Sequence, residues 1–228
     1  MCGHTAEYVR FEAPTRENHL CQGCGASLRY RLQANAITAA YGWPDVPLAR
    51  LAEERFFREL VIYEPGMIGP FRHLLMELPG YVNSYFWPEV APGDEHEGVR
   101  CEDLRHLTFG DESMDLVISS DILEHVRGPM QAFAEIFRVL RPDGYHIFTV
   151  PLRWPLPGTT QARVDCSGPE DKFLVPPEYH GSPHDPKGSL VYTDFGMDLP
   201  EQLRELGFDT TAHHGYRHAV TFVSRKQP

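Results

Sequence analysis

The chain has 228 residues, of which 42% are hydrophobic and 23% charged, and its 21 basic and 32 acidic residues give a formal net charge of −11. The length fits one domain with a small appendage. With 13 Phe, 10 Tyr and 3 Trp, the chain can bury enough surface to exclude a disordered or fibrous protein. Because phosphate backbones are bound by clustered Lys and Arg, the acidic balance argues against a nucleic-acid partner.

Membrane insertion and secretion are not expected from the sequence. No stretch approaches the about 18 uncharged apolar residues that a membrane span needs. The first residues include Cys2, His4, Glu7 and Arg10 and lack the apolar core of a signal peptide. The five cysteines are too few and too unevenly spread for a disulfide scaffold, which fits a reducing compartment. We therefore expect a cytoplasmic protein.

Residues 1–28 are predicted to form a small module around Cys21-Gln-Gly-Cys24-Gly25. Two cysteines at this spacing, followed by glycine, make a tight turn that directs both sulfurs at one metal ion. Cys2-Gly3 has the same Cys-Gly ending, so the predicted ligands of a structural Zn²⁺ are Cys2, His4, Cys21 and Cys24. Two alternatives stay open: the true start lies upstream and supplies the missing half of a second turn, or the thiols are free in a surface loop.

Residues 29–60 are predicted to be a helical lead-in. Leu48, Leu51, Ala52 and Phe56 recur at three- and four-residue spacing after Pro47, a residue that suits the first turn of a helix. We expect two helices here that pack on the following domain, which we place at residues 61–228.

That domain opens with the pattern of a Rossmann-like unit. A short buried strand over residues 59–65 ends in an acid, and a glycine turn, Gly66-Met-Ile-Gly69, leads into a helical run over residues 71–78. Further strands are predicted at residues 80–86, 99–104, 114–120 and 145–150, and an amphipathic helix begins at Pro129 and stops at Arg141-Pro-Asp-Gly144. Strands that alternate with helices predict an α/β fold with a doubly wound parallel sheet.

The last third of the chain is predicted to hold a proline-rich segment, one helix and one strand of the same domain. It starts with a proline-rich excursion, and Asp198 and Glu201 form a capping-box pattern ahead of a helix that Gly207 ends. A last strand is predicted at residues 219–223.

At this point the order of motifs resembles the class I S-adenosylmethionine-dependent methyltransferases with a methyltransferase-11-like domain. The specific part is Phe109-Gly-Asp-Glu-Ser-Met-Asp-Leu-Val-Ile-Ser-Ser-Asp-Ile-Leu-Glu-His-Val126, together with Arg141-Pro-Asp-Gly144. The resemblance covers residues 60–150 and extends toward the end of the chain. It implies a Rossmann-like fold with a mostly parallel seven-stranded sheet and helices on both faces, and S-adenosyl-L-methionine as cofactor.

A subgroup of that family is also similar at both ends of the chain. Its zinc-knuckle head resembles the Cys-x-x-Cys sequence followed by Arg29 and Arg31, and its tail resembles Glu178-Tyr-His-Gly-Ser-Pro183 and Thr193-Asp-Phe-Gly196. This similarity implies that residues 151–197 cover the substrate.

The resemblance implies contacts for the cofactor. Glu64 would face its cationic amino-acid end, Gly66 would let the backbone approach it, and Asp103 would accept a hydrogen bond from the adenine amino group. The other implied contacts are Met67, Ser84, Leu104, Ser119, Ser120 and Asp121. For each of these residues the alternative is a plain structural role, such as a helix cap or a solvated loop acid; Asp121 in particular either contacts the cofactor or caps the short helix after it.

Two departures from the family pattern bear on cofactor binding. Ile68 and Pro70 stand where the family has glycine, and the acid that binds the ribose hydroxyls is replaced by Ser84-Tyr-Phe86. Three interpretations follow: the ribose is held differently, Glu89 reaches back to it, or the cofactor binds weakly. The missing acid also argues against a nicotinamide dinucleotide enzyme.

At the methyl-accepting end, His125 and His180 are the candidates for a general base, because a hydroxyl acceptor needs a group that titrates near neutral pH. His125 follows the fourth strand, and His180 lies in the tail. The candidate walls of a substrate pocket are Trp87, Tyr179, Tyr192 and Phe195, for which the alternative is an ordinary place in the core. A metal held by His180, His184 and Asp185 is also conceivable from spacing, but solvated loop histidines are favoured there.

We therefore expect a methyltransferase for a small-molecule acceptor that works by aligning acceptor, methyl carbon and sulfur. One alternative is a zinc-containing binding or scaffold protein with a degenerate methyltransferase domain. Another is an enzyme that uses S-adenosylmethionine without methylation, for example by sulfonium cyclisation. The motifs assign neither the acceptor atom nor an oligomeric state.

Overall fold

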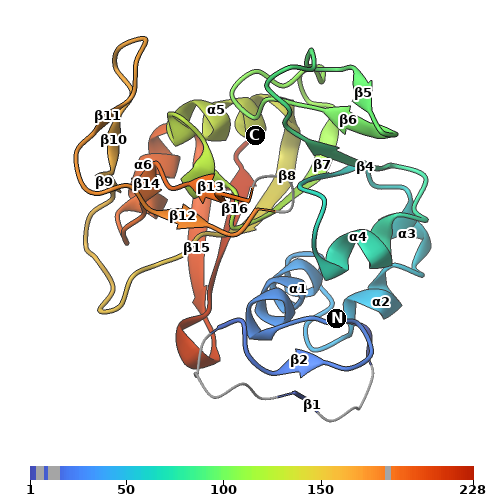
Figure 1. Cartoon of the computed structure of the whole chain (residues 1–228). Coiled ribbons are helices and arrows are strands. Elements are labelled where there is room, and N and C mark those ends of the chain that lie inside the picture. The colour runs from blue at the N-terminus through green and yellow to red at the C-terminus, as the bar shows by residue number, and fades with distance from the viewer. Residues whose placement is uncertain (4–7, 10–15, 183–185) are drawn as a thin grey trace.

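The computed structural model describes residues 1–3, 8–9, 16–182 and 186–228 (Figure 1). His4, one of the predicted zinc ligands, lies outside the described residues. None of the helices in the described part of the chain combines the length and the apolar composition that crossing a membrane would take.

The described residues form one large sheet of eight strands in the order β15-β16-β8-β7-β3-β4-β6-β5. Neighbouring strands from β8 to β6 are parallel, whereas β15, β16 and β5 pair antiparallel. The bounds are β3 Ile62–Pro65, β4 Tyr81–Tyr85, β5 Glu95–His96, β6 Val99–Cys101, β7 Met114–Ser120, β8 Leu140–Thr149, β15 Phe208–His214 and β16 Val220–Lys226. The Rossmann-like, mostly parallel sheet is confirmed.

The prediction of seven strands is wrong by one. The extra strand, β5, is a two-residue edge strand that folds back on β6. It lies in a loop rich in Pro, Gly and acids, where no apolar alternation indicates a strand. The strand β15 was not predicted either, because Phe208 is its only fully buried residue and most of the others are exposed.

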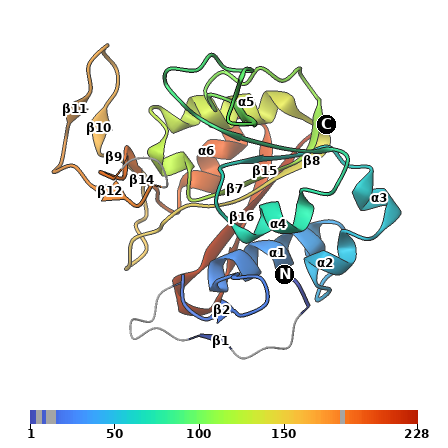
Figure 2. The same cartoon turned by 45° about the vertical axis from the view of Figure 1, so that its right-hand side comes forward.

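The helices lie on both faces of the sheet, as predicted (Figures 1 and 2). Successive residues of β7 alternate between the faces: Val117 packs in the core with α5 and α6, and Leu116 and Ile118 pack in the core with α1 to α4. The helix bounds are α1 Leu28–Ala40, α2 Leu48–Leu51, α3 Arg55–Arg58, α4 Pro70–Leu75, α5 Pro129–Val139 and α6 Leu199–Glu205, with short 3₁₀ turns η1 Leu123–His125 and η2 Tyr216–His218.

Three details correct the sequence predictions. Residues 29–60 hold three helices rather than two, since the chain leaves helical geometry between α2 and α3. Arg141 to Gly144 belong to β8, where a register irregularity against β7 absorbs them. Asp198 makes no side-chain cap for α6 in the described structure; its carboxylate accepts hydrogen bonds from the N–H and hydroxyl of Thr160 instead.

The predicted covering segment, residues 151–197, forms short hairpins in place of long elements. Its strands pair antiparallel as β9 with β14, β10 with β11 and β12 with β13. Their bounds are β9 Gln161–Ala162, β10 Val164–Asp165, β11 Lys172–Phe173, β12 Tyr179–His180, β13 Ser189–Leu190 and β14 Thr193–Asp194. Figure 1 shows β10 and β11 in a hairpin that projects from the body of the domain. At the N-terminus, β1 Tyr8–Val9 pairs with β2 Leu20–Cys21.

The start of β4 predicts a test of the sheet. A Cβ on Gly80 would lie 2.3 Å from the carbonyl oxygen of Leu60, at the point where the Ile62 N–H donates to the Gly80 carbonyl. We expect Gly80→Ala to lower the free energy of unfolding by about 2–3 kcal/mol, because this backbone contact has no room to yield. Chemical denaturation measures the change. Gly110→Ala is the control, since nothing lies within 4 Å of its added Cβ; equal losses in both variants would contradict the steric argument.

Candidate functional site

A crevice of about 560 Å³ opens where the carboxyl ends of β3, β4, β6 and β7 meet. Open α/β sheets hold their ligands at this edge, because the loops that follow neighbouring parallel strands converge there. The lining also includes Arg29 and Tyr30 from α1 and Gly181, Ser189 and Tyr192 from the tail. The crevice is therefore built from the strand ends below and from two distant parts of the chain at its sides.

The structure brings most of the predicted site residues to this crevice. The predicted residues that line it are Gly66, Met67, Ser84, Asp103, Leu104, Ser120, Asp121, His125 and Tyr192. Those that it leaves out of the lining are Glu64, Ser119, His180, Trp87, Tyr179 and Phe195. Phe195 packs in the core and Trp87 packs with Val99 and Cys101, so both occupy the structural role that the sequence left open.

Glu64 lies one layer behind the crevice, on β3. Its side chain is buried, and Tyr81 donates a hydrogen bond to it at 2.5 Å. Burial disfavours the charged carboxylate and raises its pKa to about 7, although the hydrogen bond from Tyr81 acts in the opposite direction.

The turn after β3 is compact and leaves little space for a side chain at Gly66. Gly66 has a φ of 108°, and a Cβ there would lie 3.1 Å from the side chain of Ile122. Its N–H donates to the carbonyl oxygen of Ser84 at 2.7 Å, which joins the ends of β3 and β4. The two residues that depart from the family pattern are accommodated locally. Ile68 is largely exposed at the lining of the crevice, and Pro70 occupies the first turn of α4.

The polar groups at the ends of β4 and β6 already have partners. The Ser84 hydroxyl lies 2.7 Å from that of Tyr63, and so faces the core. Asp103 accepts hydrogen bonds from the Arg105 guanidinium at 2.6 Å and from the Arg105 N–H at 2.9 Å. Burial opposes ionisation of Asp103, but these bonds outweigh it and lower its pKa. Glu89 does not appear in the lining of the crevice.

Asp121 is held in an ionic network at the end of β7. Arg16 binds both oxygens of its carboxylate, at 3.1 and 2.5 Å, and the Arg29 Nε lies 3.3 Å away. The Thr149 hydroxyl, at the end of β8, donates to the same carboxylate at 2.9 Å. Burial alone would raise the pKa of Asp121. The two guanidinium groups and the hydrogen bonds lower this pKa by more than burial raises it, so the pKa lies below its usual range. Asp121 does not cap η1 in the described structure.

Ser119 and Ser120 face different environments. The Ser119 hydroxyl lies 2.9 Å from Nε2 of His146 inside the sheet, whereas the Ser120 hydroxyl donates to Gln33 of α1 at 2.8 Å. Gln33 in turn donates to the carbonyl oxygens of Ser119 and Ile147. Sequence reasoning missed Gln33, Arg16 and Arg29 as site-forming residues, because no local pattern links α1 and the segment before it to strand ends 86 to 120 residues later.

The two candidate bases lie together. The ring centroids of His125 and His180 are 5.0 Å apart, and the rings meet edge to face. His125 lines the crevice. His125 follows β7 in η1, and His180 comes from β12 of the tail. The structure thus joins two histidines that the sequence placed in separate motifs.

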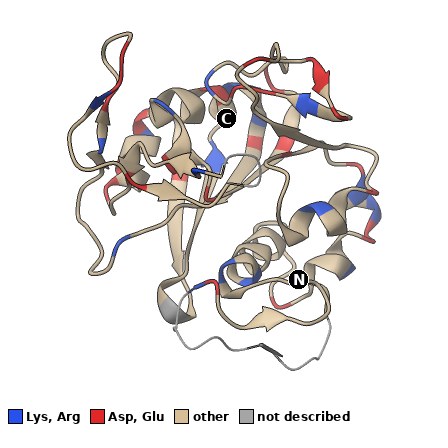
Figure 3. Ribbon diagram, in the orientation of Figure 1, with Lys and Arg blue, Asp and Glu red and all other residues tan. Residues whose placement is uncertain are grey.

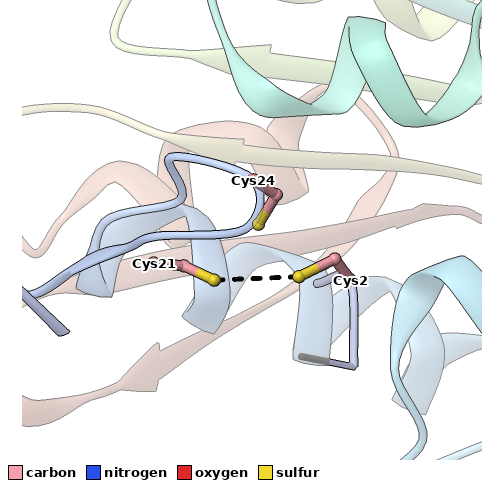
Figure 4. A group of neighbouring side chains, drawn as sticks. All are labelled: Cys2, Cys21 and Cys24. Carbon is pink, nitrogen blue, oxygen red and sulfur yellow. Dashed lines mark hydrogen bonds between the residues drawn. The ribbon is translucent and has the colours of Figure 1, made fainter. Parts of the chain in front are cut away.

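Three of the predicted zinc ligands also converge (Figure 4). The sulfurs of Cys2 and Cys21 are 3.7 Å apart, and those of Cys2, Cys21 and Cys24 all lie within 4.8 Å of one another. This distance is too long for a disulfide, and all three thiols are free. Two sulfurs on one tetrahedral Zn²⁺ at about 2.3 Å lie about 3.8 Å apart, so the cluster has the donor type and the spacing of such a site.

The Asp121 network predicts a loss of stability when its charge is removed. We expect Asp121→Asn to lower the free energy of unfolding by about 3 kcal/mol at pH 7, because two guanidinium groups then lack their shared carboxylate. Asparagine tolerates the positive φ of this residue, 54°, so the change isolates the charge. Because folding lowers the pKa of Asp121, its contribution is present above about pH 4 and is lost as the pH falls through the folded pKa.

Denaturation of wild type and variant at several pH values tests this prediction. Asp143→Asn is the matched control: Asp143 also has a positive φ, 66°, and its carboxylate pairs with Arg225, but 55% of its side chain is exposed. The control should cost less than about 1 kcal/mol. If the difference in the free energy of unfolding between wild type and Asp121→Asn stays constant down to pH 2, the stability does not depend on the ionised carboxylate of Asp121, and the prediction is wrong.

The comparisons with known proteins concern one part of the chain. Residues 87–148 match the family described as "Methyltransferase domain". This stretch begins just after β4, ends within β8 and includes Asp103, Asp121 and His125 of the crevice.

Curated relatives match over a similar part. A malonyl-[acyl-carrier protein] O-methyltransferase of Marinomonas sp. is 34% identical over 62 residues, 27% of this chain and 23% of that protein. An uncharacterized methyltransferase of Mycobacterium marinum is 39% identical over 64 residues, 26% of this chain and 25% of that protein. The matches thus span about a quarter of the length of these relatives.

Solved structures match over more of the chain but at low identity. An S-adenosylmethionine-dependent methyltransferase from Mesorhizobium loti is 16% identical and has a TM-score of 0.48, over 73% of this chain and 91% of that one. A Burkholderia thailandensis 1,6-didemethyltoxoflavin-N1-methyltransferase with bound S-adenosylhomocysteine is 17% identical and has a TM-score of 0.42, over 86% and 88%. The similarity in sequence to the methyltransferase-domain family concerns residues 87–148.

Proposed function

We propose that the protein transfers a methyl group from S-adenosylmethionine to a small-molecule acceptor. The observation that carries the proposal is the crevice at the carboxyl ends of β3, β4, β6 and β7, half of whose strand ends lie in the stretch that matches the methyltransferase domain. Its volume of about 560 Å³ is in the range of small-molecule sites. When bound, the cofactor supplies a methyl group on a positively charged sulfur.

The residues present fit such a cofactor. Gly66 leaves open a space that a Cβ would fill, so the backbone after β3 can approach a ligand closely. Behind it, Glu64 has a raised pKa because it is buried; a nearby cation would favour its ionised form. Asp103 and Leu104 follow β6 in the lining, and we propose them for the adenine ring. Met67, Ser120 and Asp121 complete this side of the crevice.

The tail and η1 are proposed for the acceptor. Gly181, Ser189 and Tyr192 line the same crevice as His125, which supports a covering role for residues 151–197. We propose that His125 and His180 assist the loss of the acceptor proton, since their rings lie together at this end. Lys and Arg lie scattered among Asp and Glu along the described ribbon (Figure 3), which fits a small acceptor better than a nucleic acid.

The proposal predicts that S-adenosylhomocysteine binds and that Gly66 is needed for it. We expect calorimetry to detect binding to the wild type and at least about tenfold weaker binding to Gly66→Ala, because the new Cβ meets Ile122 and narrows the crevice. Gly98→Ala is the matched control: Gly98 also has a positive φ, 75°, but no atom lies within 4 Å of its added Cβ.

The outcomes separate the alternatives from the proposal. No heat with wild-type protein at high concentration would contradict cofactor binding and favour a scaffold protein. Release of methylthioadenosine from S-adenosylmethionine and protein alone would favour sulfonium cyclisation. An equal loss of affinity in Gly66→Ala and Gly98→Ala would show that backbone strain, rather than the crevice, determines the effect.

We further propose that Cys2, Cys21 and Cys24 hold a structural Zn²⁺, with His4 as the fourth ligand that the sequence predicts. The support is the spacing of the three free thiols (Figure 4). A site closed by four protein ligands has no position for substrate, so its role is to hold residues 1–28 together.

This zinc site predicts a thiolate signature. We expect the protein loaded with Co²⁺ to show sulfur-to-metal charge-transfer absorption, and zinc content to fall by one equivalent per chain in Cys21→Ser. Cys166→Ser is the control, because Cys166 is also a free thiol, here half-buried, and lies outside the cluster. Equal zinc content in wild type and Cys21→Ser would refute the site.

A further inference from the structure

The carboxylate of Glu124 is buried and has no hydrogen-bond donor among the described residues. Glu124 lies in η1, directly after β7, and its side chain is 0% exposed. Among the residues that the structure describes, none donates a hydrogen bond to either of its carboxylate oxygens. Burying an unpaired carboxylate is costly, so its neighbours should show what offsets the charge.

His125 points an electron-rich nitrogen at this carboxylate. Its Nδ1 lies 2.8 Å from the carbonyl oxygen of Leu190, and since a carbonyl only accepts, Nδ1 carries the proton and donates it. In the neutral ring, Nε2 then has a lone pair, and this atom lies 3.4 Å from Glu124 Oε1. Two acceptors would face each other here unless a proton or a metal ion lies between them.

His180 repeats the arrangement from the other side. Its Nδ1 lies 3.7 Å from the same Oε1 of Glu124, and its Nε2 lies 3.5 Å from Glu178 Oε1. Glu178 itself accepts a hydrogen bond from the Arg153 guanidinium at 2.5 Å. Each imidazole therefore directs one nitrogen at Glu124 and the other at an acceptor. Histidines that bind metals have this pattern, since an outer acceptor fixes the tautomer and leaves the inner nitrogen free.

The spacing fits one metal ion. The three ligand atoms of Glu124, His125 and His180 lie within 4.8 Å of one another. Two N or O ligands at about 2.1 Å from a tetrahedral ion lie about 3.4 Å apart, close to the 3.4 and 3.7 Å found here. Two imidazoles and one carboxylate are also the ligand set of known zinc sites that keep an open position.

We propose that Glu124, His125 and His180 bind a divalent first-row transition-metal ion such as Zn²⁺, with a fourth position open toward the crevice. The opening follows from His125, which lines the crevice while its Nε2 faces the cluster. A water molecule, or an oxygen or nitrogen of the acceptor, would take this position. This site is distinct from the cysteine cluster, since the ligands are harder and come from η1 and β12.

The role of the ion rests on the proposed methyl transfer, but its binding does not. An imidazole nitrogen that binds a metal cannot accept a proton, so neither histidine is then the base. The ion instead lowers the pKa of the acceptor atom bound to it, and the proton leaves to water. The two histidines thus assist the reaction by holding the ion.

Zinc content tests the site. The full chain is loaded with Zn²⁺, dialysed into metal-free buffer and analysed for zinc, with Glu124→Gln and His180→Gln beside the wild type. We expect each variant to hold one equivalent less than the wild type, counted apart from the equivalent that Cys21→Ser removes. Glu64→Gln is the matched control, since Glu64 is also a buried glutamate with a raised pKa, and it should keep the full content.

Further readouts keep the outcomes distinct. Without metal, Glu124→Gln should melt no lower than the wild type, because it removes an unpaired buried charge; if it fails to fold, His180→Gln, 35% exposed, decides. Equal zinc content in wild type, Glu124→Gln and His180→Gln would overturn the proposal and would mean that a proton, on a histidine or on Glu124 itself, offsets the buried charge. S-adenosylhomocysteine binding, measured on the same samples, shows separately whether the proposed function stands.

Discussion

The carboxylate of Asp121 joins three parts of the chain that lie far apart in sequence. It receives Arg16 and Arg29 from the N-terminal region and Thr149 from the end of β8, at the position where β7 enters the crevice. Because Arg29 also pairs with Glu17, the first turn of α1 and the segment before it are anchored together. Asp121 and Arg29 both line the crevice, so this ion pair forms part of its wall.

The anchoring of α1 has a second, uncharged component. Gln33 lies on the same helix as Arg29 and hydrogen-bonds to the ends of β7 and β8 through backbone and hydroxyl groups. Because both an ion pair and an amide hold α1, the helix can neither move away from the strand ends nor rotate about its own axis without losing these contacts. The cysteine cluster precedes this helix, so a metal there would stabilise the segment that supplies Arg16 rather than take part in chemistry.

Two buried glutamates, Glu64 and Glu124, differ in the groups that contact their carboxylates. Glu64 has a hydrogen-bond donor in Tyr81 and lies behind a glycine, whereas Glu124 has two imidazoles and no hydrogen bond among the described residues. Burial raises the pKa of both. The first arrangement suits a carboxylate that responds to a nearby cation, and the second suits a carboxylate that binds one directly.

The sequence alone determined the elements that depend on near neighbours. The apolar run Met114–Ser120, the glycine turn at Gly66 and the amphipathic helix from Pro129 follow from local patterns of burial and backbone freedom, and all are present. Topology then follows from the alternation of strands and helices, so the crevice at the strand ends was predictable, and with it a part of its lining.

Only the tertiary structure decided which polar groups meet. Arg16 and Asp121 are 105 residues apart, and Glu124 meets His180 across the tail. The same holds for Trp87 and Phe195, whose aromatic rings fit a pocket wall or a core equally well in sequence, and for β5, which exists because β6 is beside it. These outcomes depend on the path of loops and on side-chain packing across the sheet. The path of the loops and the packing across the sheet leave no periodic pattern in the sequence, because each contact involves single residues from distant segments.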